Sequence, residues 1–295
     1  MDDLAKRYQK RLNLQHATLT KIEHEDAIVA TIYRVALPNG KHLILKICKL
    51  PRHYYREVYC LSYFAGKLPV PRIVETVAPD KDVEGAVLME CLPGRVGKIA
   101  DFNGDLAFDL GSLLGRIHQH AMPGYGELID QKSLQSSARS FFGLKFEEII
   151  SECASHLPSS LIDKCQQYYS SRLDLLDAVD GPCIVHRDFR PGNVMINKGQ
   201  IQGIIDWSSA VASFAEEDFC SMEHGEWSMD SSGKKSFLEG YRSVRPVPYY
   251  EPIMPFLRIS KALHIIGFLV KNGTWDKEQS RLYQSNRRFL EDFFG

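Results

Sequence analysis

One segment near the middle of the chain combines turn residues with two apolar runs. Val194 to Ile196 is a short apolar run, 197–200 contains turn residues, and Ile201 to Ile205 is a second, β-branched run. This pattern is typical of a β-hairpin. Asn193 precedes the first strand and Asp206 follows the second, so the turn returns both positions to the same open end, about 5 Å apart. The sequence therefore predicts that two oxygen-bearing side chains meet at one point.

A second carboxylate lies just before this hairpin, in the segment HRDFRPGN at 186–193. Pro191 and Gly192 prevent a regular helix from continuing through the segment. Asp188, an asparagine five residues later and an aspartate eighteen residues later are the groups that phosphoryl transfer needs. One carboxylate accepts the proton of an attacking hydroxyl, and two oxygen ligands hold magnesium on the phosphates of a nucleotide. The alternative is a loop held by a chance His–Asp hydrogen bond, which the predicted hairpin disfavours.

A phosphoryl-transfer centre also predicts a buried lysine that contacts phosphates. Lys46 lies in the predicted strand 42–48, on the same face as Ile44 and Cys48. A charged group in an otherwise apolar strand is costly unless it is paired or bound to a ligand. We therefore predict that Lys46 contacts the nucleotide. The alternative is an edge-strand lysine that protects against aggregation.

The helix predicted at 54–65 supplies a partner for that lysine. Glu57 falls within an apolar stripe of this helix, at spacings of three and four from Tyr54 and Leu61. A carboxylate in such a stripe needs a cation, and Lys46 is the natural one. An ordinary surface glutamate is the alternative.

The segments HRDFRPGN at 186–193 and IIDW at 204–207 resemble the catalytic loop and metal-binding segment of the aminoglycoside phosphotransferase and choline kinase family. That family is the small-molecule branch of the protein-kinase-like fold. The resemblance implies a catalytic base at Asp188, magnesium ligands at Asn193 and Asp206, and structural residues at His186 and Asp218. Protein kinases continue differently, with Asp-Phe-Gly and a later Ala-Pro-Glu. This chain has Asp206-Trp207-Ser208, and no proline between Pro191 and Pro246.

Two further segments, LPVPRIV at 68–74 and VLMECLPG at 87–94, are similar to the connector and hinge of the family. The resemblance implies that main-chain atoms of Glu90 and Cys91 contact the purine of ATP or GTP, with Met89 as an apolar neighbour. A methionine at the end of a strand is more often part of the core. The chain departs from the G-x-G-x-x-G pattern, because no glycine occurs before Gly40 and the segment 23–28 is acidic.

Length and composition agree with a two-lobed enzyme. A chain of 295 residues with a net charge of −1 and 44% hydrophobic residues can bury a full core. We predict an α+β, protein-kinase-like fold. Residues 1–92 form a nucleotide-binding lobe with an antiparallel sheet and one helix, and 93–295 form a larger, mainly helical catalytic and substrate lobe. Helices are predicted at 108–120, 134–156, 159–179, 233–242, 255–271 and 277–294.

Several classes of protein are disfavoured by the composition. No excess of basic residues suggests a nucleic-acid partner. The N-terminus has no apolar signal core, and the apolar stretch at 262–270 is too short to span a bilayer, so we expect a cytoplasmic protein without a membrane partner. The seven cysteines contain no C-x-x-C and indicate reduced thiols rather than disulfides or a zinc site. His118 is expected to be a buried structural histidine.

An acidic stretch suggests the class of acceptor. Residues 206–230 include seven acids and neither lysine nor arginine. Such a field concentrates cations, so the predicted acceptor is the hydroxyl of an aminoglycoside-like compound or aminoalcohol. The candidate contacts are Glu217, Glu223, Glu226 and Trp227. Three alternatives stay open: a solvated acidic helix, a metabolite kinase for a non-cationic sugar or hydroxy amino acid, and a catalytically weak nucleotide-binding regulatory module of the same fold.

Overall fold

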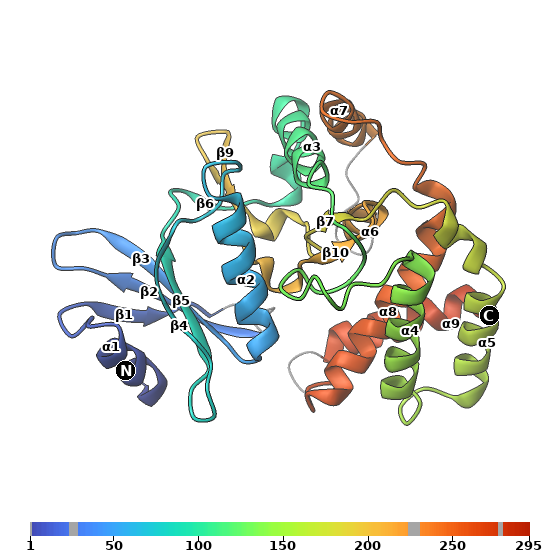
Figure 1. Cartoon of the computed structure of the whole chain (residues 1–295), viewed down its shortest axis with the longest axis horizontal. Helices are drawn as coiled ribbons and strands as arrows, with labels where there is room; N and C mark the ends of the chain where they lie inside the picture. The colour runs from blue at the N-terminus through green and yellow to red at the C-terminus, as the bar shows by residue number, and fades with distance from the viewer. Residues whose placement is uncertain (1, 24–28, 224–230, 277–279) are drawn as a thin grey trace. The chain divides into compact units, whose positions relative to one another are not determined.

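The computed structural model describes residues 2–23, 29–223, 231–276 and 280–295. The chain divides into two compact units (Figure 1). Unit 1 consists of Met1–Gln119, His186–Val211 and Trp227–Pro246, and unit 2 of His120–Val185, Ala212–Glu226 and Val247–Gly295. Unit 1 therefore joins the whole of 1–92 to the hairpin that carries Asn193 and Asp206.

A five-stranded antiparallel sheet forms the first part of unit 1. Its strands, in spatial order, are β1 (Thr18–Lys21), β2 (Ala30–Ala36), β3 (His42–Cys48), β5 (Gly85–Glu90) and β4 (Ile73–Val77). The predicted strand at 42–48 is confirmed at both ends. The two edge strands β1 and β4 were not predicted, because they are short and expose most of their residues, which leaves little alternation to detect.

The two faces of the sheet have different partners. Alternation along β3 places Leu43, Leu45 and Ile47 on one face, where they pack with Tyr8 of α1 (Asp3–Arg11). Lys46 lies on the other face, which meets α2 (Pro51–Phe64). Figure 1 shows α1 and α2 on opposite sides of the strands. The sheet is therefore covered by a helix on each face, where the sequence predicted only one.

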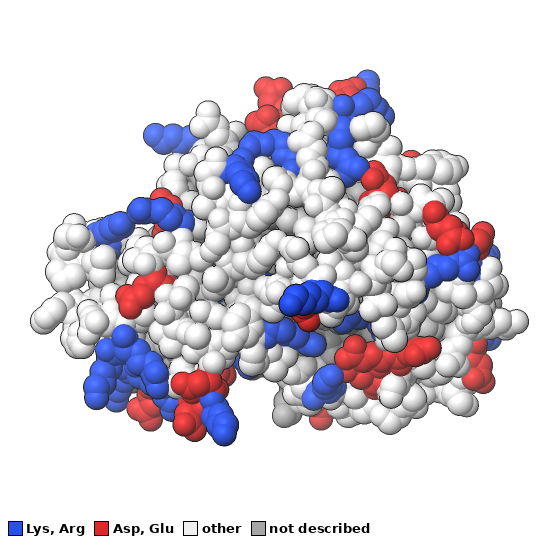
Figure 2. Space-filling model, in the orientation of Figure 1, with Lys and Arg blue, Asp and Glu red and all other residues white. Residues whose placement is uncertain are grey.

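The helix α1 is amphipathic. Asp2 caps it by accepting a hydrogen bond from the N–H of Ala5 at 2.7 Å. Its basic residues Lys6, Arg7, Lys10 and Arg11 are exposed. Figure 2 shows lysine and arginine side chains gathered on the surface over this helix. Lys10 and Arg11 lie in the last turn, where the helix dipole favours positive charge.

The predicted hairpin is confirmed as β8 (Val194–Asn197) and β9 (Gln200–Ile204), with β6 (Arg95–Val96) on the outer edge of β8. The register pairs Val194 with Ile204. Lys198 and Gly199 have φ values of 51° and 74°, as the central residues of a type I′ turn require. Asn193 ends a 3-10 helix (Pro191–Asn193) directly before β8.

The helices α3 (Gly104–His118) and α7 (Ser231–Arg242) cross at very short range within unit 1. A Cβ added at Gly111 would lie 1.9 Å from the carbonyl oxygen of Phe237, and one added at Gly240 would lie 1.9 Å from that of Phe108. The two glycines therefore let the backbones meet. Next to this crossing, His118 is buried with Nδ1 2.9 Å from the hydroxyl oxygen of Tyr241, which confirms its predicted structural environment.

Replacement of the crossing glycine Gly240 by alanine is expected to lower the free energy of unfolding by about 2 kcal/mol or more, because the new methyl group meets backbone that cannot easily move. Gly143→Ala is the matched control, since its nearest neighbour would be the Tyr169 hydroxyl at 3.5 Å. Alanine there should stabilise the helix by about 0.5–1 kcal/mol. Denaturant titration of both variants checks the prediction. Equal unfolding midpoints for Gly240→Ala and the parent protein would contradict it.

Unit 2 is mainly helical. Its elements are α4 (Ala138–Cys153), α5 (Ser159–Ser170), α6 (Glu216–Glu223), α8 (Met254–Lys271) and α9 (Ser280–Phe294), with the short strand pair β7 (Cys183–Val185) and β10 (Val211–Ser213). The predictions at 134–156 and 159–179 were too long. Ser137 caps α4 by accepting from the N–H of Ser140, and a 3-10 helix (Leu173–Asp177) replaces the end of the second predicted helix. Stacked rings form the core, with Phe146 and Tyr169 centroids 3.7 Å apart.

The helix predicted at 255–271 is confirmed as α8 (Met254–Lys271), and with the turn before it the helical run is longer than the apolar stretch at 262–270. The run Glu251–Lys271 has 21 residues and a mean hydropathy of 1.6, so by length and composition alone it could span a membrane. However, 61% of its apolar window is buried inside the protein. Leu263, Ile266 and Leu269 are fully buried, as in a core helix. None of the seven cysteines forms a disulfide bond, and six of them are buried.

Candidate active site

Lys46 stands at the centre of a buried ionic cluster in unit 1. Its ammonium nitrogen lies 2.6 Å from Glu57 Oε2 and 2.7 Å from Asp206 Oδ1. Lys46 and Glu57 are 3% and 1% exposed. The structure thus brings together the predicted strand lysine, the helix glutamate and the aspartate that follows the hairpin, which are separated by up to 160 positions in the chain.

The three charges shift one another. Burial disfavours the ammonium form of Lys46, but the attraction of Asp206 and then Glu57 outweighs it and raises the pKa of Lys46. Burial alone would raise the pKa of Asp206. The attraction of the Lys46 ammonium group outweighs burial, so the pKa of Asp206 is lowered. For Glu57, burial exceeds the effect of Lys46, and its pKa is raised. Lys46 and Asp206 therefore form the charged pair, and Glu57 is the partner whose charge is least favoured.

The backbone at Asp206 is unusual. This residue has φ 64° and ψ 67°, a left-handed conformation that costs a non-glycine residue about 1 kcal/mol or more. Its Oδ1 accepts hydrogen bonds from Lys46 and, at 2.6 Å, from the hydroxyl of Ser208. These two contacts hold the strained turn in place. Among the described residues, Asp206 Oδ2 has no hydrogen-bond partner.

Asn193 is tied to Asp188 through both amide hydrogens. Its Nδ2 donates to the main-chain oxygen of Asp188 at 2.8 Å and to Oδ2 of the same residue at 2.7 Å. No donor in the described part of the chain contacts Asn193 Oδ1. The main-chain oxygen of Asn193 accepts from the N–H of Ile205 at 2.9 Å, so Asn193 and Asp206 lie next to each other across the hairpin.

These two uncommitted oxygens match what a hard divalent cation requires. Asn193 Oδ1 and Asp206 Oδ2 are the oxygen ligands that magnesium prefers. Across the described ranges, no group of three or more His, Cys, Asp or Glu side chains could hold a metal by itself. The donor set therefore fits a cation that is bound by two protein groups and completed by phosphate and water oxygens.

Arg190 forms an ion pair with Asp188 that was not predicted from the sequence. Its Nε lies 3.3 Å from each carboxylate oxygen of Asp188. The side chains of Arg190 and Asp188 are 30% and 35% exposed, so this pair is open to solvent. The sequence signal that could have found it is a charged residue two positions after the aspartate of the loop.

His186 connects the loop to the hairpin. Its Nε2 lies 3.2 Å from the main-chain oxygen of Ile205, and its Nδ1 accepts from the N–H of Asp188 at 3.3 Å. The ring is fully buried and packs 4.6 Å from the ring of Trp207. These contacts link the loop 186–193 to the end of the hairpin.

The predicted hinge residues lie at and just after the end of β5. Met89 is buried and pairs with Ile44 in the sheet, as the core alternative expected. Glu90 and Cys91 are partly exposed. The N–H of Glu90 donates to the main-chain oxygen of Arg72 at 2.9 Å. A main-chain contact from Glu90 to a purine would therefore use its carbonyl group.

The acidic residues after the hairpin are largely engaged within unit 2. Glu216 is buried and accepts from the N–H of Asp180 at 3.0 and 3.2 Å. Glu217 accepts from the hydroxyl of Ser213, and Asp218 is fully buried in α6. Glu223 is half-buried at the end of α6. The candidate contacts Glu226 and Trp227 lie outside the described residues.

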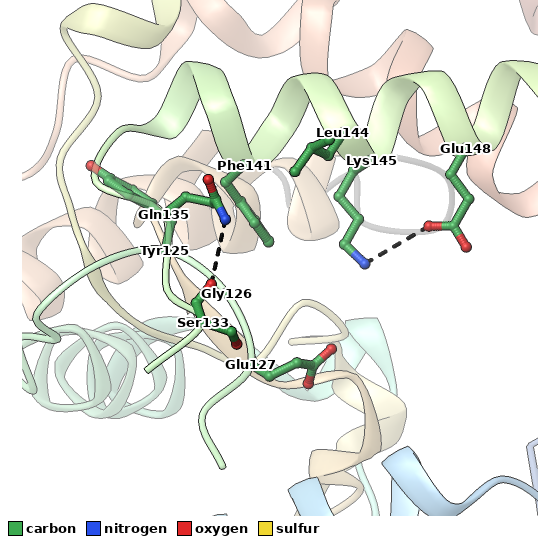
Figure 3. A pocket seen from close by; sticks show the side chains of 9 residues that line it. All are labelled: Tyr125, Gly126, Glu127, Ser133, Gln135, Phe141, Leu144, Lys145 and Glu148. Atoms are coloured by element: carbon green, nitrogen blue, oxygen red, sulfur yellow. Dashed lines mark hydrogen bonds and ion pairs between the residues drawn. The ribbon is translucent and has the colours of Figure 1, made fainter. Parts of the chain in front are cut away.

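Unit 2 also contains a hollow that the sequence did not indicate. Its volume is about 210 Å³, and it lies between the loop after α3 and one face of α4. Figure 3 shows Lys145 and Glu148 projecting from α4 toward the loop with Glu127, with Lys145 Nζ 4.0 Å from Glu148 Oε2. The wall consists of Tyr125, Gly126, Glu127, Ser133, Gln135, Phe141, Leu144, Lys145 and Glu148. The hollow thus combines aromatic rings with charges of both signs.

Solved structures of phosphotransferases are similar to this fold. A thermostable mutant of aminoglycoside phosphotransferase APH(4)-Ia, in complex with AMP-PNP and hygromycin B, is 14% identical, with 96% of this chain and 97% of that chain covered and a TM-score of 0.68. Amicoumacin kinase hAmiN, with AMP-PNP, Ca²⁺ and Ami, is 18% identical over 98% and 95%, with a TM-score of 0.67. Macrolide 2'-phosphotransferase MphH from Brachybacterium faecium is 16% identical over 98% of both chains, with a TM-score of 0.64. No curated protein sequence matches this one significantly.

The likeness at these identities establishes the fold, and with the five-stranded antiparallel sheet and the helices it confirms the predicted α+β, protein-kinase-like class. The family is established by sequence. A model of the phosphotransferase enzyme family matches residues 24–252, which include the ionic cluster, the loop and the hairpin. The chain therefore belongs to the phosphotransferase enzyme family, the family of the aminoglycoside phosphotransferases.

Proposed function

We propose that this protein is a small-molecule kinase that transfers the γ-phosphate of ATP or GTP to a hydroxyl group. The observation that carries the proposal is the joint presence, in unit 1, of the Lys46 ion pairs and of two oxygens without partners on Asn193 and Asp206. Phosphoryl transfer needs positioned charge more than covalent chemistry, and these groups supply it.

Each group has a distinct task in this proposal. Asp188 accepts the proton of the attacking hydroxyl. Lys46, oriented by Glu57, contacts the nucleotide phosphates. The Glu90 carbonyl and the Cys91 amide contact the base. Magnesium, when bound, would be held by Asn193 and Asp206 and would neutralise charge on the phosphates.

We propose a cationic acceptor, either aminoglycoside-like or an aminoalcohol. The structures of related fold hold hygromycin B or Ami beside AMP-PNP, which supports a small-molecule acceptor. The hollow in unit 2 carries the carboxylates of Glu127 and Glu148. Glu148, however, lies within 4.0 Å of both Lys145 and Lys271. This neutralisation favours a non-cationic sugar or hydroxy amino acid as the second candidate. We also propose a cytoplasmic location, which the seven cysteines, none of them in a disulfide bond, support.

Titration with nucleotides tests the proposal. Magnesium ATP or GTP is expected to raise the melting temperature of the wild-type protein, and removal of the metal with a chelator should cancel most of the rise. Asp206→Asn should weaken binding of the magnesium–nucleotide complex about tenfold or more, because it removes a charged ligand. Asp163→Asn, an exposed aspartate of α5, is the control and should bind like the wild type.

Turnover then separates the two classes of function. We expect phosphate transfer to at least one member of a panel of aminoglycosides, aminoalcohols, hydroxy amino acids and sugars. Phosphorus NMR of the product measures this transfer. A protein that binds magnesium nucleotide but transfers phosphate to no acceptor, water included, would be a regulatory nucleotide-binding module. Equal magnesium–nucleotide affinity for Asp206→Asn and the wild type would remove Asp206 from the metal site.

A further inference from the structure

We propose that Arg190 is a further catalytic residue, which contacts Asp188 in this structure and the transferring phosphoryl group during the reaction. This inference rests on the proposed function, in which Asp188 is the base. Three observations carry it: the contact of Arg190 with both oxygens of Asp188, the unequal hold on those oxygens, and the space that Gly192 leaves for the guanidinium group.

The two carboxylate oxygens of Asp188 are not held equally. Oδ2 accepts from Asn193 Nδ2 at 2.7 Å and from Arg190 Nε at 3.3 Å. Oδ1 is contacted by Arg190 Nε alone among the described residues, also at 3.3 Å. Contacts of 3.3 Å are long for a charge-assisted hydrogen bond. Oδ1 is therefore the oxygen that an acceptor hydroxyl can engage at the lowest cost, by displacing Arg190.

Gly192 determines where the rest of the guanidinium group lies. A Cβ added there would be 2.6 Å from Nη1 and 3.4 Å from Cζ of Arg190. Gly192 does not have a positive φ, so the backbone itself does not require glycine at this position. The glycine leaves room for the arginine to fold back over the loop. Nε consequently faces Asp188, and the terminal nitrogens lie over the segment between Asp188 and Asn193.

During phosphoryl transfer, the position of the Arg190 guanidinium group would bring its N–H donors close to the reacting phosphate. The acceptor oxygen forms a bond to the γ-phosphorus while its proton passes to Asp188 Oδ1, and the bond between that phosphorus and the β–γ bridging oxygen breaks. The electron pair of the broken bond leaves with the nucleoside diphosphate. Negative charge on the transferring group needs donors close to the base, because the base and the phosphorus flank the same acceptor oxygen. Arginine presents five N–H donors in a planar fork that suits phosphate oxygens.

The rate of phosphoryl transfer tests the role. Release of ADP from magnesium ATP, with water or an acceptor from the panel, is to be measured under single-turnover conditions. Arg190→Ala is expected to slow transfer about a hundredfold or more. The affinity for magnesium AMP-PNP should stay within about threefold, since the contact forms during transfer. Arg190→Lys should keep part of the rate. Low-millimolar methylguanidine should restore part of the rate to Arg190→Ala and none to Arg190→Lys.

Gly192→Ala provides a second variant that keeps the arginine and its charge. The added methyl group displaces only the far end of a flexible side chain, so the variant should fold with an unchanged melting temperature. It is nevertheless expected to slow transfer at least tenfold. Arg139→Ala is the matched control, because Arg139 forms an exposed bidentate pair with Asp177 in unit 2. This control should transfer phosphate at the wild-type rate.

The outcomes separate this inference from the proposed function. Transfer by Arg190→Ala within about threefold of the wild type, with Asp188→Ala inactive, would overturn the role of Arg190 and leave the kinase intact. A failure of methylguanidine to rescue, together with loss of AMP-PNP binding, would show a merely structural role. A wild-type protein that binds magnesium ATP but releases no ADP with any acceptor would overturn both proposals.

Discussion

Asp188→Ala is expected to lose about a thousandfold in the rate of phosphoryl transfer while its affinity for magnesium nucleotide changes little. General bases contribute about 10²–10⁴ to the rates of such reactions. The only described partners of the Asp188 carboxylate are Asn193 and Arg190, so its removal does not disturb the Lys46 cluster. Asn193 also keeps its bond to the main-chain oxygen of residue 188. Single-turnover ADP release and an AMP-PNP titration measure the two quantities.

Two further variants sharpen this result. Asp188→Asn keeps the shape of the side chain and loses its basicity, so it should be as slow as Asp188→Ala. Asp177→Ala removes an exposed carboxylate that is paired with Arg139 and should retain the wild-type rate. Transfer at the parental rate by Asp188→Asn would show that Asp188 only positions the acceptor.

Lys46→Met is expected to cost about 3–5 kcal/mol of folding free energy and to abolish nucleotide binding. Removal of one partner from a buried ionic cluster leaves the others uncompensated. Glu57 is 1% exposed, and its ion-pair partner is Lys46, whose ammonium nitrogen lies 2.6 Å from Glu57 Oε2. Denaturant titration and a nucleotide titration measure the two losses. Lys164→Met, at an exposed position of α5, is the control and should unfold at nearly the wild-type midpoint.

A second substitution and a change of pH test the cause of that loss. The double variant Lys46→Met/Glu57→Gln should regain part of the folding free energy, because the uncompensated charge of Glu57 is removed. It should not regain nucleotide binding. Burial already raises the pKa of Glu57. Without Lys46 the folded state favours the protonated acid still more, so the deficit of Lys46→Met should shrink as the pH falls toward the ordinary pKa of glutamate. A deficit that grows on acidification would contradict this cause.

Local patterns predicted the parts of the site that lie on regular elements. The strand 42–48 could be predicted from an apolar run that follows a Pro-Asn-Gly turn, and the period of two along a strand places Lys46 on the face of Ile44 and Cys48. Glu57 could be found because one carboxylate interrupts an apolar helical stripe. The turn residues between β8 and β9 were sufficient to predict that Asn193 and Asp206 meet. In each case the information lies within about fifteen neighbouring residues.

Features that depend on distant contacts could not be predicted in this way. The helix α1 buries only Ala5 and Tyr8, and the strands that they pack against come later in the chain. The hydrogen bond of Ser208 to Asp206 depends on a left-handed turn, which a sequence of ordinary residues does not announce. The partner of Glu216 is the N–H of Asp180, 36 residues earlier. A count of acids along the chain therefore could not show that this carboxylate is buried and bonded within unit 2.

Under the proposed function, the sharing of Lys46 between two carboxylates would make metal and nucleotide bind cooperatively. In this structure Asp206 is paired with the ammonium group that would contact the phosphates under the proposed function. A cation that draws Asp206 toward itself releases Lys46 for phosphate, and a phosphate that draws Lys46 away releases Asp206 for the cation. The coupling is reciprocal, so each ligand raises the affinity for the other by the same factor. A phosphate ester without metal, or a divalent ion without nucleotide, should therefore bind weakly. The metal–nucleotide complex should bind more tightly, because it can separate the ion pair between Lys46 and Asp206.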